Sequence, residues 1–244
     1  MRKASDWGGN IIAFVAVIAV NAMANGLPIG GKTTGEVSAN YPSLFTPAGF
    51  TFSIWGLIYL ALTVFIIWQA LPAQRGNQSL SQIGVPFKIS CLANAIWIFA
   101  WHYDFTALSF LLMLLILGSL IQIFRGINAS TSILVSFPFS LYMGWITVAT
   151  IANFSAVQTA WGLNDAGISS IEWTWLKLAV AGTIGAVVVA RTRNIVFLLV
   201  ISWAAFGIYS KQTATPEVAG AAITLSLLAL LLSVYTLIFG RSRS

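Results

Sequence analysis

The chain has 244 residues, of which 58% are hydrophobic and only 7% are charged. A soluble domain carries charge on about a quarter of its residues, so this composition excludes a soluble globular protein and indicates that lipid covers much of the surface. The chain has a single cysteine, Cys91, and a single histidine, His102, which excludes an internal disulfide and a zinc site built from these ligand types.

Eight stretches of the sequence are apolar over the roughly 20 residues that a transmembrane helix requires. In chain order they cover residues 9–27, 47–71, 82–102, 105–124, 132–158, 173–190, 194–210 and 216–239. We therefore predict an all-α integral membrane protein with eight transmembrane helices.

Residues typical of helix ends support these limits. Pro47 and Pro216, each preceded by a threonine, stand at the starts of the second and eighth stretches. Asp104 is positioned to cap the fourth stretch. Pro138 lies inside the fifth stretch and predicts a kink there.

The charged residues indicate which side of the membrane each connection faces. In membrane proteins Lys and Arg concentrate in the cytoplasmic segments. With both termini cytoplasmic, the cytoplasmic segments hold nine of the twelve basic residues: Arg2, Lys3, Arg75, Lys88, Arg125, Arg191, Arg193, Arg241 and Arg243. The outer side then holds five of the six acidic residues: Glu36, Asp104, Asp165, Glu172 and Glu217. We therefore predict cytoplasmic termini in a plasma or inner membrane. Nucleic-acid binding is not expected, since the basic residues form no continuous patch.

The first apolar stretch has an alternative interpretation as a secretory signal. Arg2 and Lys3 precede an apolar run, and the small residues Ala22 and Ala24 follow it, as in a cleavable signal peptide. The even number of predicted helices favours a retained helix. An intact-mass measurement distinguishes the two.

Two polar connections are longer than the others, residues 30–46 and 160–172, and both lie on the predicted outer side. The second separates a part rich in Trp, Asn and Pro from a part that is almost wholly aliphatic and small. We therefore expect a five-helix membrane core in residues 1–165 and a three-helix transmembrane extension in residues 166–244.

Ionisable side chains are almost absent from the predicted spans, where they would mark an ion path or a catalytic group. Lys88 lies one turn into the third span, and its long stem can reach the cytoplasmic interface. The sequence contains no Ser-His-Asp set, phosphate-binding loop or pair of intramembrane carboxylates. We therefore predict no catalytic or metal-binding residue. A membrane enzyme that modifies a lipid or a tetrapyrrole is the third and least favoured alternative, because the sequence shows no nucleophile, metal set or intramembrane acid for it.

Neutral polar and aromatic residues do occur within the predicted spans, and they recur on single helix faces. Asn21 and Asn25 are four residues apart, as are Trp55 and Tyr59. Because amide groups need hydrogen-bond partners in hydrocarbon, these faces should turn toward other helices. Spacing alone allows them either to hold the helices together or to line a ligand site. Two further faces consist of Asn94, Trp97 and Trp101, and of Tyr142, Trp145, Ala149 and Asn153.

Three motifs occur in a fixed order. Residues 41–59 contain Tyr-Pro-Ser-Leu, a proline three residues later, and Trp-Gly-x-x-Tyr at their end. Residues 92–97 read Leu-Ala-Asn-Ala-Ile-Trp, and residues 142–153 read Tyr-x-x-Trp-x-x-x-Ala-x-x-x-Asn. Together these motifs resemble the first loop with the second helix, the third helix and the fifth helix of the TspO/translocator protein family, the tryptophan-rich sensory proteins.

The resemblance implies a five-helix bundle that binds hydrophobic planar ligands such as porphyrins. The pocket is expected between the first, second, third and fifth helices and under the first loop. The family requires no cofactor, and the resemblance implies a homodimer as its usual assembly. The residues carried over as ligand-binding candidates are Trp55, Tyr59, Asn94, Trp97, Tyr142, Trp145, Ala149 and Asn153.

We therefore expect a multi-pass membrane sensor, or a binding or transport protein, of the TspO-like class. Its partners would be the lipid bilayer and a hydrophobic small molecule, a tetrapyrrole or a similar planar ligand. The alternative is a small secondary transporter for a neutral or amphipathic solute, in which all eight helices form one unit. The chain departs from the family pattern in its first loop, which lacks the family's tryptophan, and after Trp97, where Ile98 and Phe99 replace paired prolines.

Overall fold

The computed structural model describes residues 3–240 except 28, 78, 128–130 and 164–166. Several features named above lie outside these residues. They are four of the charged residues, Arg2, Asp165, Arg241 and Arg243, the side chain of Asn25, and the expected domain boundary after residue 165. The described residues form helices joined by short connections, and no strand occurs among them.

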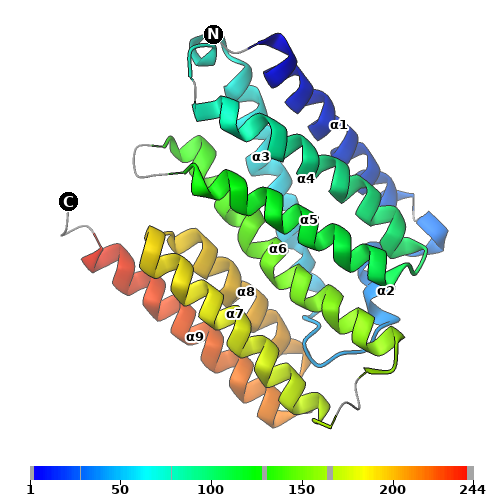
Figure 1. Ribbon diagram of the computed structural model, residues 1–244. Coiled ribbons are helices and arrows are strands. Elements are labelled where there is room, and N and C mark those ends of the chain that lie inside the picture. The colour runs from blue at the N-terminus through cyan, green and yellow to red at the C-terminus, as the bar shows by residue number, and fades with distance from the viewer. Residues whose placement is uncertain (1–2, 28, 78, 128–130, 164–166, 241–244) are drawn as a thin grey trace.

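Each predicted span coincides with a helix in the described part of the chain (Figure 1). These helices are α1 Ala4–Gly26, α3 Ile54–Ala70, α4 Ser79–His102, α5 Thr106–Arg125, α6 Ile133–Ala160, α7 Ser170–Thr192, α8 Ile195–Lys211 and α9 Pro216–Phe239. Seven of the described helices are long and apolar enough to cross a membrane, and α8, with 17 residues, is shorter. A helix of that length extends about 26 Å, slightly less than a typical hydrocarbon core. The multi-pass architecture is thus confirmed, and the count of eight spans stays a prediction.

Three short helices in the connections were not predicted from the sequence: the 3-10 helices η1 Ile29–Gly31 and η3 Pro72–Gln74, and the α-helix α2 Thr34–Ala39. A fourth short helix, the 3-10 helix η2 Gly49–Ser53, lies within the predicted span 47–71 and directly precedes α3. A capping box begins α2: the Thr33 amide donates to the Glu36 carboxylate at 2.7 Å, and the Glu36 amide donates to the Thr33 hydroxyl at 3.3 Å. The bond from the Thr33 backbone is the main cause that lowers the pKa of Glu36 below its ordinary value.

Two of the expected helix starts differ from the structure. The helical segment near Pro47 begins only at Gly49, because the backbone of the preceding Ala48 is extended, with ψ 151°. The Ala48 amide donates to the carbonyl of Gly207 in α8 at 2.9 Å. Asp104 does not cap α5: its backbone is left-handed, with φ 60°, and its carboxylate accepts a hydrogen bond from the Tyr41 hydroxyl. Pro216 is the first residue of α9, as expected.

The long helix α6 lies at the centre of the bundle and packs against α3, α5 and α8. On one side of it, α5 packs on α4, and α4 on α1. On the other side, α8 packs on α9 and α7 (Figure 1). A Cβ atom added to Gly144 of α6 would lie 3.0 Å from Cβ of Val200 in α8, so glycine permits a close approach of these two helices.

One buried apolar core contains residues from both sides of the expected domain boundary, including Ile146 of α6 and Ile201 of α8. The division into a core and an extension stays a prediction. The start of α1 and the end of α9 lie at the same end of the bundle, and α2 lies at the opposite end (Figure 1). We name residues 34–47, which comprise α2 and the loop after it, the cover.

Candidate functional site

A narrow cavity of about 40 Å³ lies beneath the cover, between α3, α4, α5 and α6. We name it the aromatic cavity. A space of this size holds only a few water-sized groups. The cover contributes Thr34, Ser38, Tyr41, Thr46 and Pro47 to its lining. The remaining lining residues are mostly aromatic or small: Phe52, Trp55, Trp97, Trp101, Met113, Trp145, Val148, Ala149, Ala152, Asn153 and Ala156.

Five of the eight ligand-binding candidates line this cavity: Trp55, Trp97, Trp145, Ala149 and Asn153. The other three, Tyr59, Asn94 and Tyr142, are absent from its described lining. The expected set of helices also differs, because α5 contributes Met113 and no described residue of α1 takes part. The role of these residues in ligand binding stays a prediction.

A chain of hydrogen bonds next to the cavity joins α1, α4 and α6. The Asn21 amide donates to the Asn94 side-chain oxygen at 2.8 Å, and the Asn94 amide donates to the Tyr142 hydroxyl at 3.1 Å. All three side chains are buried. Since an unpaired amide in hydrocarbon is costly, this chain holds the three helices in register. In this structure Asn94 and Tyr142 therefore bind other helices and do not face the cavity.

Asn153 lies at the cavity, and its amide already has partners. Its side-chain oxygen accepts from the Ser109 hydroxyl at 2.5 Å and from the Trp97 indole nitrogen at 3.3 Å. Its amide nitrogen donates to the carbonyl of Ala149 at 3.1 Å. Asn153 therefore ties α4, α5 and α6 together at the cavity wall.

Aromatic rings form two walls of the cavity. Trp97 stacks on Trp101 with ring centroids 5.9 Å apart and an interplanar angle of 16°. Across the cavity, Trp145 meets the rings of Phe52 and Trp55 edge to face, at 5.8 Å and 6.3 Å. Aromatic faces in such walls can stack on a planar ligand.

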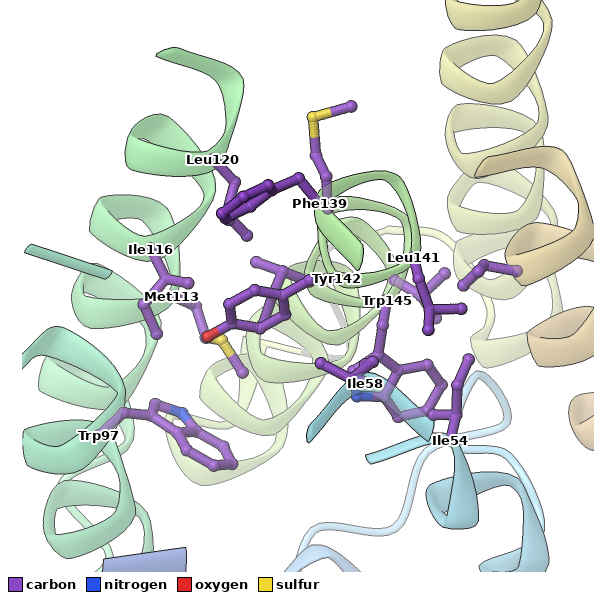
Figure 2. Close-up of a cluster of buried hydrophobic side chains, with 14 of the residues drawn as sticks. Ile54, Ile58, Trp97, Met113, Ile116, Leu120, Phe139, Leu141, Tyr142 and Trp145 are labelled. Carbon is purple, nitrogen blue, oxygen red and sulfur yellow. The ribbon is translucent and has the colours of Figure 1, made fainter. Parts of the chain in front are cut away.

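Two buried polar side-chain atoms of lining residues lack partners within the described chain. They are the indole nitrogen of Trp145, whose side chain is 2% exposed, and the hydroxyl oxygen of Thr34. An indole N–H only donates, and buried donors are nearly always paired. Figure 2 shows Trp145 directed from α6 toward Ile54 and Ile58 of α3, while Tyr142 points to the other side of α6. The lining of the cavity thus includes a buried donor without a partner among the described residues.

Contacts with α4, with α6 and with the turn after α4 hold the cover over the cavity. The Trp101 indole of α4 donates to the carbonyl of Thr34 at 3.1 Å, and the Tyr41 ring lies 5.6 Å from the Trp101 ring. Thr159 of α6 donates to the carbonyl of Pro42 at 3.3 Å. Burial, followed by the hydrogen bond to the Asp104 carboxylate, raises the pKa of Tyr41.

Sequence reasoning missed the residues that the cover supplies to the site. The Thr-x-x-Glu pattern of residues 33–36 was the available signal, because it is the pattern of a capping box. This pattern predicts that a short helix begins at Thr34, in the connection between the first two membrane spans. No comparable pattern distinguishes Met113 from the other apolar residues of α5.

The comparisons agree with this architecture. The model of the family described as TSPO-like protein matches residues 7–235, which include the described helices from α2 to α8 and most of α1 and α9. No curated protein and no solved structure matches the chain. Because the family match covers nearly the whole sequence, and the structure is a bundle of apolar helices that could span a membrane, the chain belongs to the TSPO-like protein family.

Proposed function

We propose that this multi-pass membrane protein binds a planar hydrophobic ligand, a tetrapyrrole such as protoporphyrin or a similar molecule, in the aromatic cavity. It would act there as a sensor or a carrier. The observation that carries the proposal is the buried indole N–H of Trp145, a residue that lines the aromatic cavity and whose N–H has no acceptor among the described residues. A ligand with a polar atom at its edge would supply that acceptor.

The remaining lining suits the same ligand class. The stacked pair Trp97 and Trp101 provides a flat apolar wall. Ala149, Ala152 and Ala156 recur at intervals of three and four residues along α6, so small side chains repeat along the α6 wall after Trp145. Ligand sites of this kind combine apolar walls with a few directed polar groups.

Binding of a macrocycle requires the cavity to widen. Its volume is about 40 Å³, whereas sites for drug-sized ligands occupy about 300–1,000 Å³. The cover is the part of the lining that lies outside the long helices, and a few contacts such as the Trp101 bond to Thr34 hold it. Ligand entry is therefore expected to displace residues 34–47.

The test is a titration of the purified protein with protoporphyrin, followed by the Soret absorbance of the ligand and by tryptophan emission. We expect saturable binding that weakens by about fivefold in Trp145→Phe, because this variant keeps an aromatic ring and loses one hydrogen bond of about 1 kcal/mol. Trp161→Phe is the matched control, since Trp161 is 61% exposed at the end of α6 and does not line the cavity.

A second variant, Ala149→Phe, fills the cavity and should abolish saturable binding. Binding of protoporphyrin by Ala149→Phe with wild-type affinity, or an equal loss in Trp145→Phe and Trp161→Phe, would rule out this site. The protein is titrated in nanodiscs, and a titration of empty nanodiscs is the blank, because it measures how much porphyrin partitions into lipid alone.

The alternative function is secondary transport of a neutral or amphipathic solute through a unit that includes all the long helices. The contacts of η2 with α8 favour it: the Trp203 indole donates to the carbonyl of Thr51 at 3.0 Å, and α8 packs on α6. Transport further requires alternate opening at both ends of the bundle. Protoporphyrin uptake into proteoliposomes that continues beyond one molecule per chain would identify transport, whereas saturation at that ratio supports a binding protein.

A further inference from the structure

A second cavity, of about 480 Å³, lies at the end of the bundle that carries α2. It is bounded by residues 38–44 of the cover, the first turns of α7 and the end of α8. Because Lys177 and Lys211 both line it, we name it the lysine cavity. It shares only Ser38 with the described lining of the aromatic cavity.

Lys177 is unusual because it is a buried cation inside a membrane-spanning helix. It lies seven residues after the start of α7 and is only 7% exposed. Its ammonium nitrogen is 5.9 Å from the centre of the Phe154 ring and 5.8 Å from that of the Trp173 ring. No ion pair or hydrogen bond joins it to any other residue that the structure describes. Cation–π contacts offset only part of the cost of burying a charge.

The rest of the lining also presents donors. Lys211, the last residue of α8, brings a second cation that has no carboxylate partner within the described residues. The indole nitrogen of Trp173 is buried and has no acceptor there. No described lining residue is acidic. Two ammonium groups and an unpaired N–H around one cavity are complementary to an anion.

The cavity also has an apolar side. Leu44 of the cover and the Trp173 ring line it beside the cations. The cavity lies at the ends of α7 and α8, where a bilayer would meet water. An anionic group could therefore reach the lysines while an attached hydrocarbon part remained among apolar side chains.

We propose that the lysine cavity binds the anionic group, a phosphate or a carboxylate, of an amphipathic molecule. The Lys177 ammonium would be its central contact, and Lys211 would add a second charge. This site is separate from the proposed porphyrin site, because its cations and Trp173 do not line the aromatic cavity. A variant of Lys177, Lys211 or Trp173 is therefore not expected to abolish porphyrin binding.

The test uses the full-length protein in phosphatidylcholine nanodiscs. The anionic probes are dioctanoyl phosphatidylglycerol and decanoate, and dioctanoylglycerol is the uncharged control. We expect an anionic probe to raise the unfolding temperature in a saturable manner, with one molecule per chain retained in native mass spectrometry. A response to phosphatidylglycerol alone identifies a phosphate headgroup as the ligand, and a response to decanoate alone identifies a carboxylate.

Two lysine variants separate the site from general surface charge. Lys177→Met removes the cation and keeps an unbranched stem, and it should weaken binding by about tenfold or more. Without a probe this variant should unfold at a higher temperature than the wild type, because a buried unpaired charge has been removed. Lys32→Met is the matched control: Lys32 is exposed, its ammonium contacts Asn40, and it does not line the cavity, so this variant should bind as the wild type does.

Three results would overturn the proposal: wild-type affinity in Lys177→Met, an equal loss in Lys32→Met, or equal stabilisation of the wild type by dioctanoylglycerol. If Lys177→Met does not fold, Lys211→Gln at the exposed end of α8 takes its place. That variant should bind the anionic probe more weakly than the wild type, and wild-type affinity would count against the site.

Discussion

The Tyr41 hydroxyl donates a hydrogen bond of 2.6 Å to a carboxylate oxygen of Asp104, and so joins the cover to the turn between α4 and α5. Asp104 adopts a left-handed backbone, with φ 60°, which Asp tolerates better than most residues. The turn thus directs a carboxylate toward the cover. If ligand entry displaces the cover, this bond must break.

The first prediction concerns the Tyr41→Phe variant. A hydrogen bond to a charged group contributes about 1.5–3 kcal/mol when buried, and solvent reduces the value for this exposed pair to about 1 kcal/mol. We therefore expect the amides of residues 34–47 to exchange with deuterium about fivefold faster than in the wild type. Tyr103→Phe, at an exposed neighbouring position, serves as the control. Unchanged exchange in Tyr41→Phe would mean that this bond does not hold the cover.

The second prediction is a dependence on alkaline pH. The raised pKa of Tyr41 means that the folded state binds the phenolic proton more tightly than the unfolded state does. The resulting stabilisation is fully present below the ordinary tyrosine pKa of 10.0 and is lost as the pH rises through the higher value of the folded state. As the pH rises above 10.0, the unfolding temperature should therefore fall less in Tyr41→Phe than in the wild type. Parallel curves for the two proteins would exclude Tyr41 as the responsible group.

The third prediction tests the hydrogen-bond chain between α1, α4 and α6. Asn94→Ala leaves the amide of Asn21 and the hydroxyl of Tyr142 without this partner. We expect a loss of about 1–3 kcal/mol in the free energy of unfolding. Ser119→Ala on α5 removes a hydroxyl that bonds only within its own helix and should have a much smaller effect.

The double variant Asn21→Ala/Asn94→Ala should lose less stability than Asn21→Ala and Asn94→Ala lose together, because the second change removes a group that the first has already left unpaired. Unfolding in mixed detergent measures these differences. If the double variant loses as much stability as the two single variants lose together, or more, the direct contact between Asn21 and Asn94 is ruled out.

Hydropathy predicted the long helices well, since a lipid environment requires about 20 apolar residues for each crossing. It could not predict α2, a helix of six residues that depends on the capping box at Thr33 and Glu36. The charge distribution leaves Lys177 among the three basic residues outside the cytoplasmic segments, and it gives no sign that this lysine is buried in α7. Its position near a span end looks like that of any interfacial lysine, and only the packing of Phe154 and Trp173 around it reveals the difference.

The candidate site was also predicted only in part from the sequence. Helical spacing identified the faces that carry Asn94, Trp97, Tyr142, Trp145 and Asn153, and all five residues are buried. Spacing could not separate the amides that bind other helices from the rings that line a cavity. That difference depends on which side chains meet, as when Asn94 meets Tyr142 of α6 while Trp97 faces the cavity.

The last prediction asks whether α7, α8 and α9 form one unit with the preceding helices. Gly144→Val places side-chain atoms where Val200 of α8 already packs, since a Cβ atom alone would approach the Val200 Cβ to 3.0 Å. Overpacking of this kind costs about 1–3 kcal/mol, and it should weaken protoporphyrin binding if α8 supports α6 at the aromatic cavity. Val200→Ala in the same chain should restore most of the stability and the binding. If Gly144→Val separates α8 from α6 but leaves protoporphyrin binding unchanged, the five-helix core is independent of the extension, and the single-unit transporter loses its support.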